Sequence, residues 1–230
     1  MPVEKKMSNE SLQILLNAQK KAYQLAPAPL VQKRRSQLTQ LKDALLTYQD
    51  KLVAALEQDY GRRSAQDTLL SDILPCVMSI NYTIKNLKKW MKPQRRHAGL
   101  LLSPAKINVH YQPLGVIGII APWNFPVMLS IGPLITALAA GNRAMIKLSE
   151  FTPATNSVIT HMLASIFDND TVAVVEGEAD VAAAFSSLAF NHLIFTGSTT
   201  VGRHVMRAAA DNLTPVTLEL GGKSPVIIAD

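Results

Sequence analysis

The chain has 230 residues, of which 48% are hydrophobic and 17% are charged. This composition excludes a disordered chain and supplies enough apolar material for a substantial core in one or two domains. The formal net charge of +6 would suit an anionic partner. However, the densest basic stretch, residues 85–97, lacks the interleaved aromatic residues of a surface that binds single-stranded nucleic acid. We interpret it as the solvated face and end of a helix, and expect no nucleic-acid partner.

One cysteine, Cys76, is present, which excludes an internal disulfide and a cysteine-based metal cluster. The histidines lack the spacing of a metal site, and the N-terminus lacks the apolar segment of a secretory signal, so we expect no metal and a cytoplasmic location. Residues 113–140 are apolar enough to resemble a membrane span, but they contain four prolines. We therefore predict a strand, a loop and a shorter helix there, and no membrane span.

The first part of the chain has the apolar periodicity of helices. Apolar residues recur every three or four positions over 38–56, which predicts one helix. Ser64 and Asp67 resemble a capping box at the start of a second helix, whose apolar face covers 73–87. Cys76 lies beside that face, so we interpret it as a core or half-buried residue and not as a nucleophile.

Beyond residue 106, apolar strands alternate with helices. We predict strands at 107–111, 114–120, 143–148, 171–175, 192–196, 216–220 and 225–228, and helices at 153–167, 178–187 and 198–211. Thr152 is the expected N-cap of the first of these helices. The pattern predicts an α/β fold with a doubly wound parallel sheet, preceded by N-terminal helices. Ligands of such sheets bind beyond the carboxyl ends of the strands, so the loops there are the candidate sites.

The loop after the strand 192–196 has the composition of an anion site. Gly197 permits a tight turn, and the first amides of the following helix, with the Ser198 hydroxyl, would face a phosphate. Gly202 would let the helix pack closely against the sheet. The motif is neither a P-loop nor GxGxxG, because Arg203-His204 replaces the Lys-Ser/Thr of a P-loop. A plain helix N-cap and a variant dinucleotide site remain as alternatives.

Two further strand ends carry polar side chains. Asn124 follows the strand that ends at Ile120 and could donate to a developing oxyanion; alternatively, it ties down its own loop. Lys147 and Glu150 flank the end of the strand 143–148 and could hold ribose hydroxyls; the alternative is a surface ion pair.

Glu219 stands between apolar strand residues, just before Gly221 and Gly222. A carboxylate buried in such surroundings resists ionisation. We therefore expect a raised pKa for Glu219, in the range that suits a general base.

Four motifs in this order resemble the aldehyde dehydrogenase superfamily. They are residues 122–124, Lys147-x-x-Glu150, residues 195–202 and residues 219–223, and the resemblance covers nearly the whole chain. The short N-terminal lead, Asp59-Tyr60-Gly61 and Glu150-Phe151-Thr152-Pro153 most resemble its coniferyl-aldehyde and fatty-aldehyde branch. The resemblance implies an aldehyde-dehydrogenase-like fold with a Rossmann-like dinucleotide-binding domain over 106–230. Residues 1–105 would pack on that domain as helices and form one structural unit with it. It also implies a homo-oligomeric full-length enzyme that oxidises a small-molecule aldehyde, with coniferyl aldehyde as one candidate.

The resemblance assigns roles to the strand-end residues. Asn124 would donate to the oxyanion of a thiohemiacetal, and Glu219 would be the general base. The implied cofactor-binding residues are Ile120, Trp123, Lys147, Glu150, Gly197, Ser198, Gly202 and Leu220. Lys147 and Glu150 would hold the adenosine ribose of NAD or NADP, and Leu220 would meet the nicotinamide. NAD is slightly favoured, because the Glu150 carboxylate repels a 2′-phosphate.

The nucleophilic cysteine that the resemblance implies would lie a few dozen residues beyond Glu219, past Asp230. Cys76 precedes every motif and matches no catalytic position. We therefore expect this chain to be the truncated cofactor-binding part of an enzyme, without most of the catalytic and oligomerisation parts and inactive by itself. The alternative is a catalytically inactive nucleotide-binding or interaction module.

Overall fold

The computed structural model describes residues 8–228. The N-terminal elements are α1 (Asn9–Leu25), α2 (Val31–Thr47), α3 (Gln49–Tyr60), α4 (Ala65–Thr68), the π-helical turn η1 (Leu69–Ile73), α5 (Leu74–Trp90), β1 (Gln94–Arg96) and β2 (Ile107–Val109). They are followed by β3 (Val116–Ile120), α6 (Pro126–Ala140), β4 (Arg143–Lys147), α7 (Pro153–Ala164), β5 (Val172–Val175), α8 (Ala179–Ser186), β6 (His192–Gly197), α9 (Thr199–Ala210) and β7 (Val216–Leu220).

Five parallel strands form the central sheet in the order β5-β4-β3-β6-β7. The chain enters at β3, moves outward through β4 to β5, and then crosses back to β6 on the other side of β3. Ile120 at the end of β3 pairs with both Lys147 and Phe195, so the carboxyl ends of three strands meet at this reversal. The predicted doubly wound parallel sheet is confirmed, and its switch point lies between β3 and β6.

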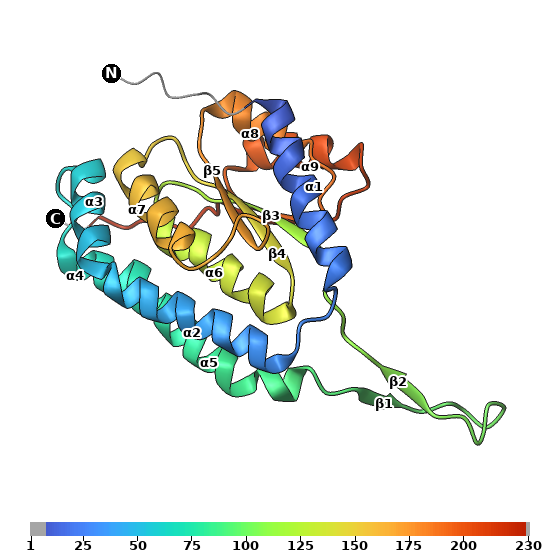
Figure 1. Cartoon of the computed structure of the whole chain (residues 1–230). Coiled ribbons are helices and arrows are strands. Elements are labelled where there is room, and N and C mark those ends of the chain that lie inside the picture. The colour runs from blue at the N-terminus through green and yellow to red at the C-terminus, as the bar shows by residue number, and fades with distance from the viewer. Residues whose placement is uncertain (1–7, 229–230) are drawn as a thin grey trace.

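Helices cover both faces of the sheet (Figure 1). Alternate residues of a strand point to opposite faces, and those of β3 divide accordingly. Ile117 and Ile119 join a core cluster with α2, α3, α5, α6 and α7. Val116 and Ile120 join a second cluster with α1, α8 and α9. Residues before and after position 105 thus share both clusters, while the domain division at 105 stays a prediction.

Three of the predicted elements differ from the structure. The helix over 38–56 is interrupted at Tyr48 (φ −95°, ψ 1°), where α3 turns to pack on α7. Residues 94–96 and 107–109 form an antiparallel hairpin that projects from the body, so the basic stretch ends on a strand and not on a helix (Figure 1). Residues 225–228 form no strand, because no described strand lies beside them to accept their backbone hydrogen bonds.

The start of α7 is capped from a distant element. Thr152 occupies the N-cap position as predicted, but its hydroxyl bonds with Ser149 and Asn156 and caps no amide. Instead, the Asp59 carboxylate of α3 accepts hydrogen bonds from the amides of Ala154 (3.0 Å) and Thr155 (2.8 Å). The first turn of α7 is therefore held by tertiary structure, which local sequence does not reveal.

Among the described residues, no helix has the length and apolar character needed to cross a membrane. The apolar segment that resembled a span divides into β3, a loop and α6, as predicted.

Candidate functional site

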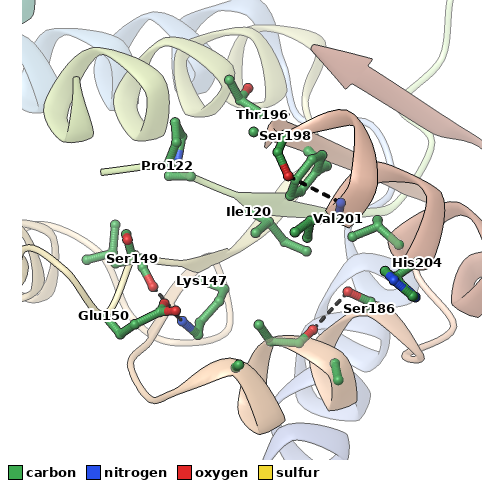
Figure 2. Close-up of a pocket in the computed structure, with 18 of the residues that line it drawn as sticks. Ile120, Pro122, Lys147, Ser149, Glu150, Ser186, Thr196, Ser198, Val201 and His204 are labelled. Atoms are coloured by element: carbon green, nitrogen blue, oxygen red, sulfur yellow. Dashed lines mark hydrogen bonds and ion pairs between the residues drawn. The ribbon is translucent and has the colours of Figure 1, made fainter. Parts of the chain in front are cut away.

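A cavity of about 540 Å³ lies beyond the carboxyl ends of β3, β4 and β6, with α8 and α9 as its further walls (Figure 2). The structure brings a large part of the predicted cofactor-binding set into its lining: Ile120, Trp123, Lys147, Glu150, Gly197 and Ser198. These residues come from three strand ends and the segments that follow them. They meet because the strands before them end side by side at the switch point.

Lys147 is the last residue of β4 and is almost fully buried, with 1% of its surface exposed. Its Nζ donates to the Leu148 carbonyl oxygen (2.6 Å) and lies 3.5 Å from Oε2 of Glu150. Burial lowers the pKa of the Lys147 ammonium group, and the nearby carboxylate of Glu150 opposes that decrease. The alternative of a surface ion pair is therefore wrong, because the cation lies inside the cavity wall.

The N-terminus of α9 opens on the same cavity. Ser198 is its N-cap, and the Ser198 Oγ accepts a hydrogen bond from the Val201 amide at 3.3 Å. The hydroxyl proton of Ser198 stays available to donate. The amides of Thr199 and Thr200 fall in the first turn, where a helix offers no internal acceptor. The N-cap that we predicted as one alternative is confirmed, and the free donors around it are compatible with an anion as well.

The two glycines of this motif, Gly197 and Gly202, let neighbouring side chains lie close to the backbone. Gly197 does not have a positive φ, so its backbone angle does not itself require glycine. A Cβ at position 197 would lie 2.5 Å from Cζ of Phe195. A Cβ at Gly202 would lie 2.8 Å from Cδ2 of Leu220, so this glycine lets α9 approach β7 as predicted.

The sequence analysis did not predict the residues of α8 and α9 that form the helical walls of the cavity. Small residues of α8 face hydrophobic and polar residues of α9 across it: Ala179, Ala182, Ala183 and Ser186 face Val201, His204, Val205 and Ala208. The spacing of the α8 set, three or four residues apart, is the signal that could have indicated one small-residue face. Figure 2 places Ser186 and His204 on these two walls.

Asn124, Glu219 and Leu220 do not line the cavity. Asn124 is exposed on the loop after β3, and Leu220 packs against Gly202. Glu219 is exposed on β7, which pairs only with β6 among the described strands, so the expected burial between apolar neighbours is wrong. The structure gathers the residues predicted to hold the adenosine and phosphate groups, while the catalytic assignments stay predictions.

Cys76 is fully buried, as predicted, and its Sγ lies 3.6 Å from the Met128 sulfur. Burial raises the pKa of the Cys76 thiol to about 12, and the Asp72 carboxylate adds to the rise. A thiol in this setting is a poor source of thiolate. Within residues 8–228, no group of His, Cys, Asp and Glu side chains is arranged to hold a metal ion.

Comparisons with known proteins agree with this geometry. Residues 4–230 match the model of the "Aldehyde dehydrogenase family". The chain is 56% identical over 219 residues to a probable coniferyl aldehyde dehydrogenase of Pseudomonas aeruginosa, covering 95% of this chain and 46% of that protein. It is 47% identical over 221 residues to a coniferyl aldehyde dehydrogenase of Pseudomonas sp., covering 96% and 45%.

Two solved structures share the fold. A substrate-bound state of Staphylococcus aureus AldH has a TM-score of 0.90 at 35% identity, over 93% of this chain and 46% of that one. An NAD+ complex of an aldehyde dehydrogenase from Bacillus cereus has a TM-score of 0.84 at 28% identity, over 98% and 46%. The chain thus spans just under half the length of these relatives.

Proposed function

Because the chain belongs to the aldehyde dehydrogenase family, we propose that it supplies the NAD(P)-binding part of an enzyme that oxidises an aldehyde to a carboxylic acid. The observation that carries this proposal is the cavity at the switch point, where buried Lys147 and the N-terminus of α9 face one space. Dinucleotides bind α/β sheets at this place.

The residues present fit such a cofactor. The volume of about 540 Å³ lies in the range of small-molecule sites. Between α8 and α9 the cavity has one wall of small residues, on α8, which leaves room for a flat ring, and the free amides after Ser198 suit a phosphate. Lys147 and Glu150 would hold ribose hydroxyls at the end of β4. When bound, the nicotinamide would supply the hydride acceptor for the oxidation.

For the catalytic step we propose the roles that the family resemblance implies. Asn124 would donate a hydrogen bond to the oxyanion, and Glu219 would accept a proton as general base. Leu220 would meet the nicotinamide end. The buried Cys76 does not suit the nucleophile, since burial raises its pKa to about 12. We therefore propose that residues 1–230 alone bind the cofactor without turnover.

Three finer points belong to the same proposal. The Glu150 carboxylate would repel a 2′-phosphate, so we propose a preference for NAD over NADP. Relatives named coniferyl aldehyde dehydrogenase support an aromatic aldehyde of that kind as the substrate of the complete enzyme. The homo-oligomer, the cytoplasmic location and the lack of a nucleic-acid partner stay predictions.

The test is a titration of the full chain with NAD and with NADP, followed by tryptophan fluorescence, with an aldehyde-oxidation assay alongside. Ser198→Asp places a negative charge at the anion site, and Lys147→Ala removes the buried cation. We expect each to weaken NAD binding at least about tenfold, since a hydrogen bond to a charged group contributes about 1.5–3 kcal/mol. Lys85→Ala, an exposed lysine of α5, is the matched control for lost charge.

Binding without turnover supports the proposal, and a tighter Kd for NAD than for NADP supports the preference. A folded chain that binds neither nucleotide contradicts the cofactor site. Turnover by the 230 residues alone contradicts the proposed lack of activity.

A further inference from the structure

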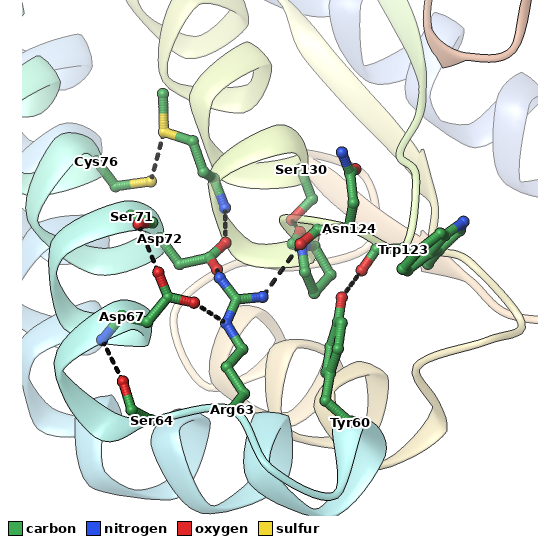
Figure 3. Close-up of polar contacts among 12 residues, drawn as sticks. Tyr60, Arg63, Ser64, Asp67, Ser71, Asp72, Cys76, Trp123, Asn124 and Ser130 are labelled. Carbon is green, nitrogen blue, oxygen red and sulfur yellow. Dashed lines mark hydrogen bonds and ion pairs between the residues drawn. The ribbon is translucent and has the colours of Figure 1, made fainter. Parts of the chain in front are cut away.

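The loop after β3 is held from behind by the segment that joins α3 to α5 (Figure 3). The Tyr60 hydroxyl donates to the Trp123 carbonyl oxygen. Nη1 of Arg63 donates to the next carbonyl oxygen, that of Asn124, at 3.1 Å. Two consecutive carbonyls of the loop are therefore fixed by side chains that lie almost next to each other in sequence.

The Arg63 guanidinium is surrounded by two aromatic rings and two carboxylates. Its side chain is 6% exposed, and its Cζ lies 5.1 Å from the ring centroids of both Tyr60 and Phe125. At its edge, Nη2 donates to Oδ2 of Asp72 at 2.6 Å, and Nε lies 3.2 Å from Oδ2 of Asp67. Rings on the faces and carboxylates at the edge leave Nη1 pointing at the loop, an arrangement that lysine cannot reproduce.

Asp72 links Arg63 to the start of α6, which follows the loop. Its carboxylate is fully buried within η1, and its Oδ1 accepts from the Met128 amide at 2.8 Å. That amide belongs to the first turn of α6, where it has no acceptor inside the helix. Burial raises the pKa of Asp72, while the Met128 amide and Arg63 oppose the rise. One charged pair thus fixes both the middle of the loop and the start of the helix after it.

The side chain of Asn124 is left free by these contacts. Its carboxamide is exposed and has no hydrogen-bond partner among residues 8–228, although its own backbone carbonyl is held. Its neighbour Trp123 lines the cofactor cavity. The restraint therefore acts on the backbone of Trp123, which lines the cavity, and of Asn124, which is proposed to contact the oxyanion.

We propose that Tyr60, Arg63 and Asp72 form a loop clamp, a set of positioning residues that holds Trp123 and Asn124 in place for cofactor and substrate. The proposal rests on the function proposed for the cavity. A loop that is ordered before binding pays less conformational entropy when the ligand arrives, so the clamp raises cofactor affinity without touching the cofactor.

The experiment uses the full chain with Trp90→Phe, which leaves Trp123 as the one tryptophan. Tyr60→Phe keeps the ring and removes the bond to the Trp123 carbonyl. Arg63→Gln combined with Asp72→Asn removes the pair without leaving a buried charge alone. Glu57→Gln is the matched control, since Glu57 is an exposed carboxylate of α3 and is not part of the clamp.

We expect both clamp variants to bind NAD roughly 3- to 30-fold more weakly, in line with the loss of one or two hydrogen bonds. Trp123 emission should shift, and hydrogen exchange should quicken at the Met128 amide in the double variant but not at the amides of α9. Glu57→Gln should leave all three readouts unchanged. If both variants fold and keep the affinity and the Trp123 emission of the parent, the clamp is refuted.

Failure of the clamp can be told from failure of the proposed function. A parent chain that does not bind NAD contradicts the function, while Trp123 emission and exchange at Met128 still report on the clamp. If the double variant does not fold, the milder Tyr60→Phe decides through emission and affinity.

Discussion

Lys147 is a cation that is buried in the folded chain and lines the cavity proposed to bind the cofactor. Among residues 8–228, its Nζ has the Leu148 carbonyl oxygen at 2.6 Å and the Glu150 carboxylate at 3.5 Å as partners. Burying an ammonium group is costly even beside a counter-ion, and functional sites are where such groups often occur. The sequence predicted that Lys147 would lie at the end of a strand, but not that it would be buried, because burial depends on which elements pack around that strand end.

The lowered pKa of Lys147 gives a pH dependence of stability. The folded chain releases this proton at a lower pH than the unfolded chain, whose lysine titrates near 10.5. Between the two pKa values the unfolded state binds more protons, so the free energy of unfolding rises with pH. Urea denaturation measures the free energy of unfolding of wild type and of Lys147→Met. We expect wild type to gain stability relative to Lys147→Met as the pH rises through the alkaline range below 10.5. The exposed Lys85→Met should show no such shift; a flat difference for Lys147→Met would contradict the burial effect.

The two glycines at the start of α9 should differ in their tolerance of a methyl group. Gly197→Ala would press on Phe195, a core ring that is 4% exposed, and should lower the free energy of unfolding by about 1–3 kcal/mol. Gly202→Ala meets only the end of the Leu220 side chain, and it replaces glycine within a helix, which favours folding. We expect its effect to stay within about 1 kcal/mol. Urea denaturation of both variants measures which one loses more free energy of unfolding. A larger loss for Gly202→Ala than for Gly197→Ala would refute this account.

Among the helices and strands, the periodicity of apolar residues predicted the features that depend on local sequence, such as the bounds of a strand. The strand 216–220 has the predicted bounds, because apolar residues that alternate with polar ones, bounded by turn residues, indicate a strand directly. No proline or glycine marks the break between α2 and α3 at Tyr48. The break accompanies the packing of α3 on α7, which the local sequence does not indicate. Nor does the sequence around α7 show its cap, because Asp59 reaches it from another helix.

Removing that distant cap should weaken the fold. Asp59→Ala leaves the amides of Ala154 and Thr155 without their acceptor, and we expect the free energy of unfolding to fall by about 0.5–2 kcal/mol. Glu57→Ala removes an exposed carboxylate from the same helix and should cost less than about 0.5 kcal/mol. Chemical denaturation compares the two; equal effects would mean that the Asp59 contacts add nothing to stability.

The whole molecule has two tryptophans in different parts of the fold, Trp90 at the end of α5 and Trp123 at the end of the sheet. Since both core clusters combine residues from before and after position 105, we expect the chain to unfold as one cooperative unit. Trp90→Phe and Trp123→Phe variants should report the same urea midpoint as circular dichroism. Two separate midpoints would show that the helical segment and the sheet are independent domains.

The site was predictable to the extent that it lies at strand ends. Parallel strands bring their carboxyl ends to one edge, so Lys147 and Ser198 were placed together correctly from order alone. The α8 wall and the contacts of Arg63 depend on which helices face each other, and no local pattern specifies that. The burial expected for Glu219 was wrong for the same reason: an acid between apolar residues is buried only if the strand has neighbours on both sides.

Asp59 and Asp72 lie on one short segment, and each holds the first turn of a different helix, α7 and α6. Those helices begin where the loops on two sides of the cavity end. The loops after β3 and β4 therefore both lead into helices that are held by one piece of chain, and that piece lies outside the cavity. We expect an inserted or deleted residue between positions 59 and 72 to weaken the proposed nucleotide binding while leaving every cavity-lining residue intact.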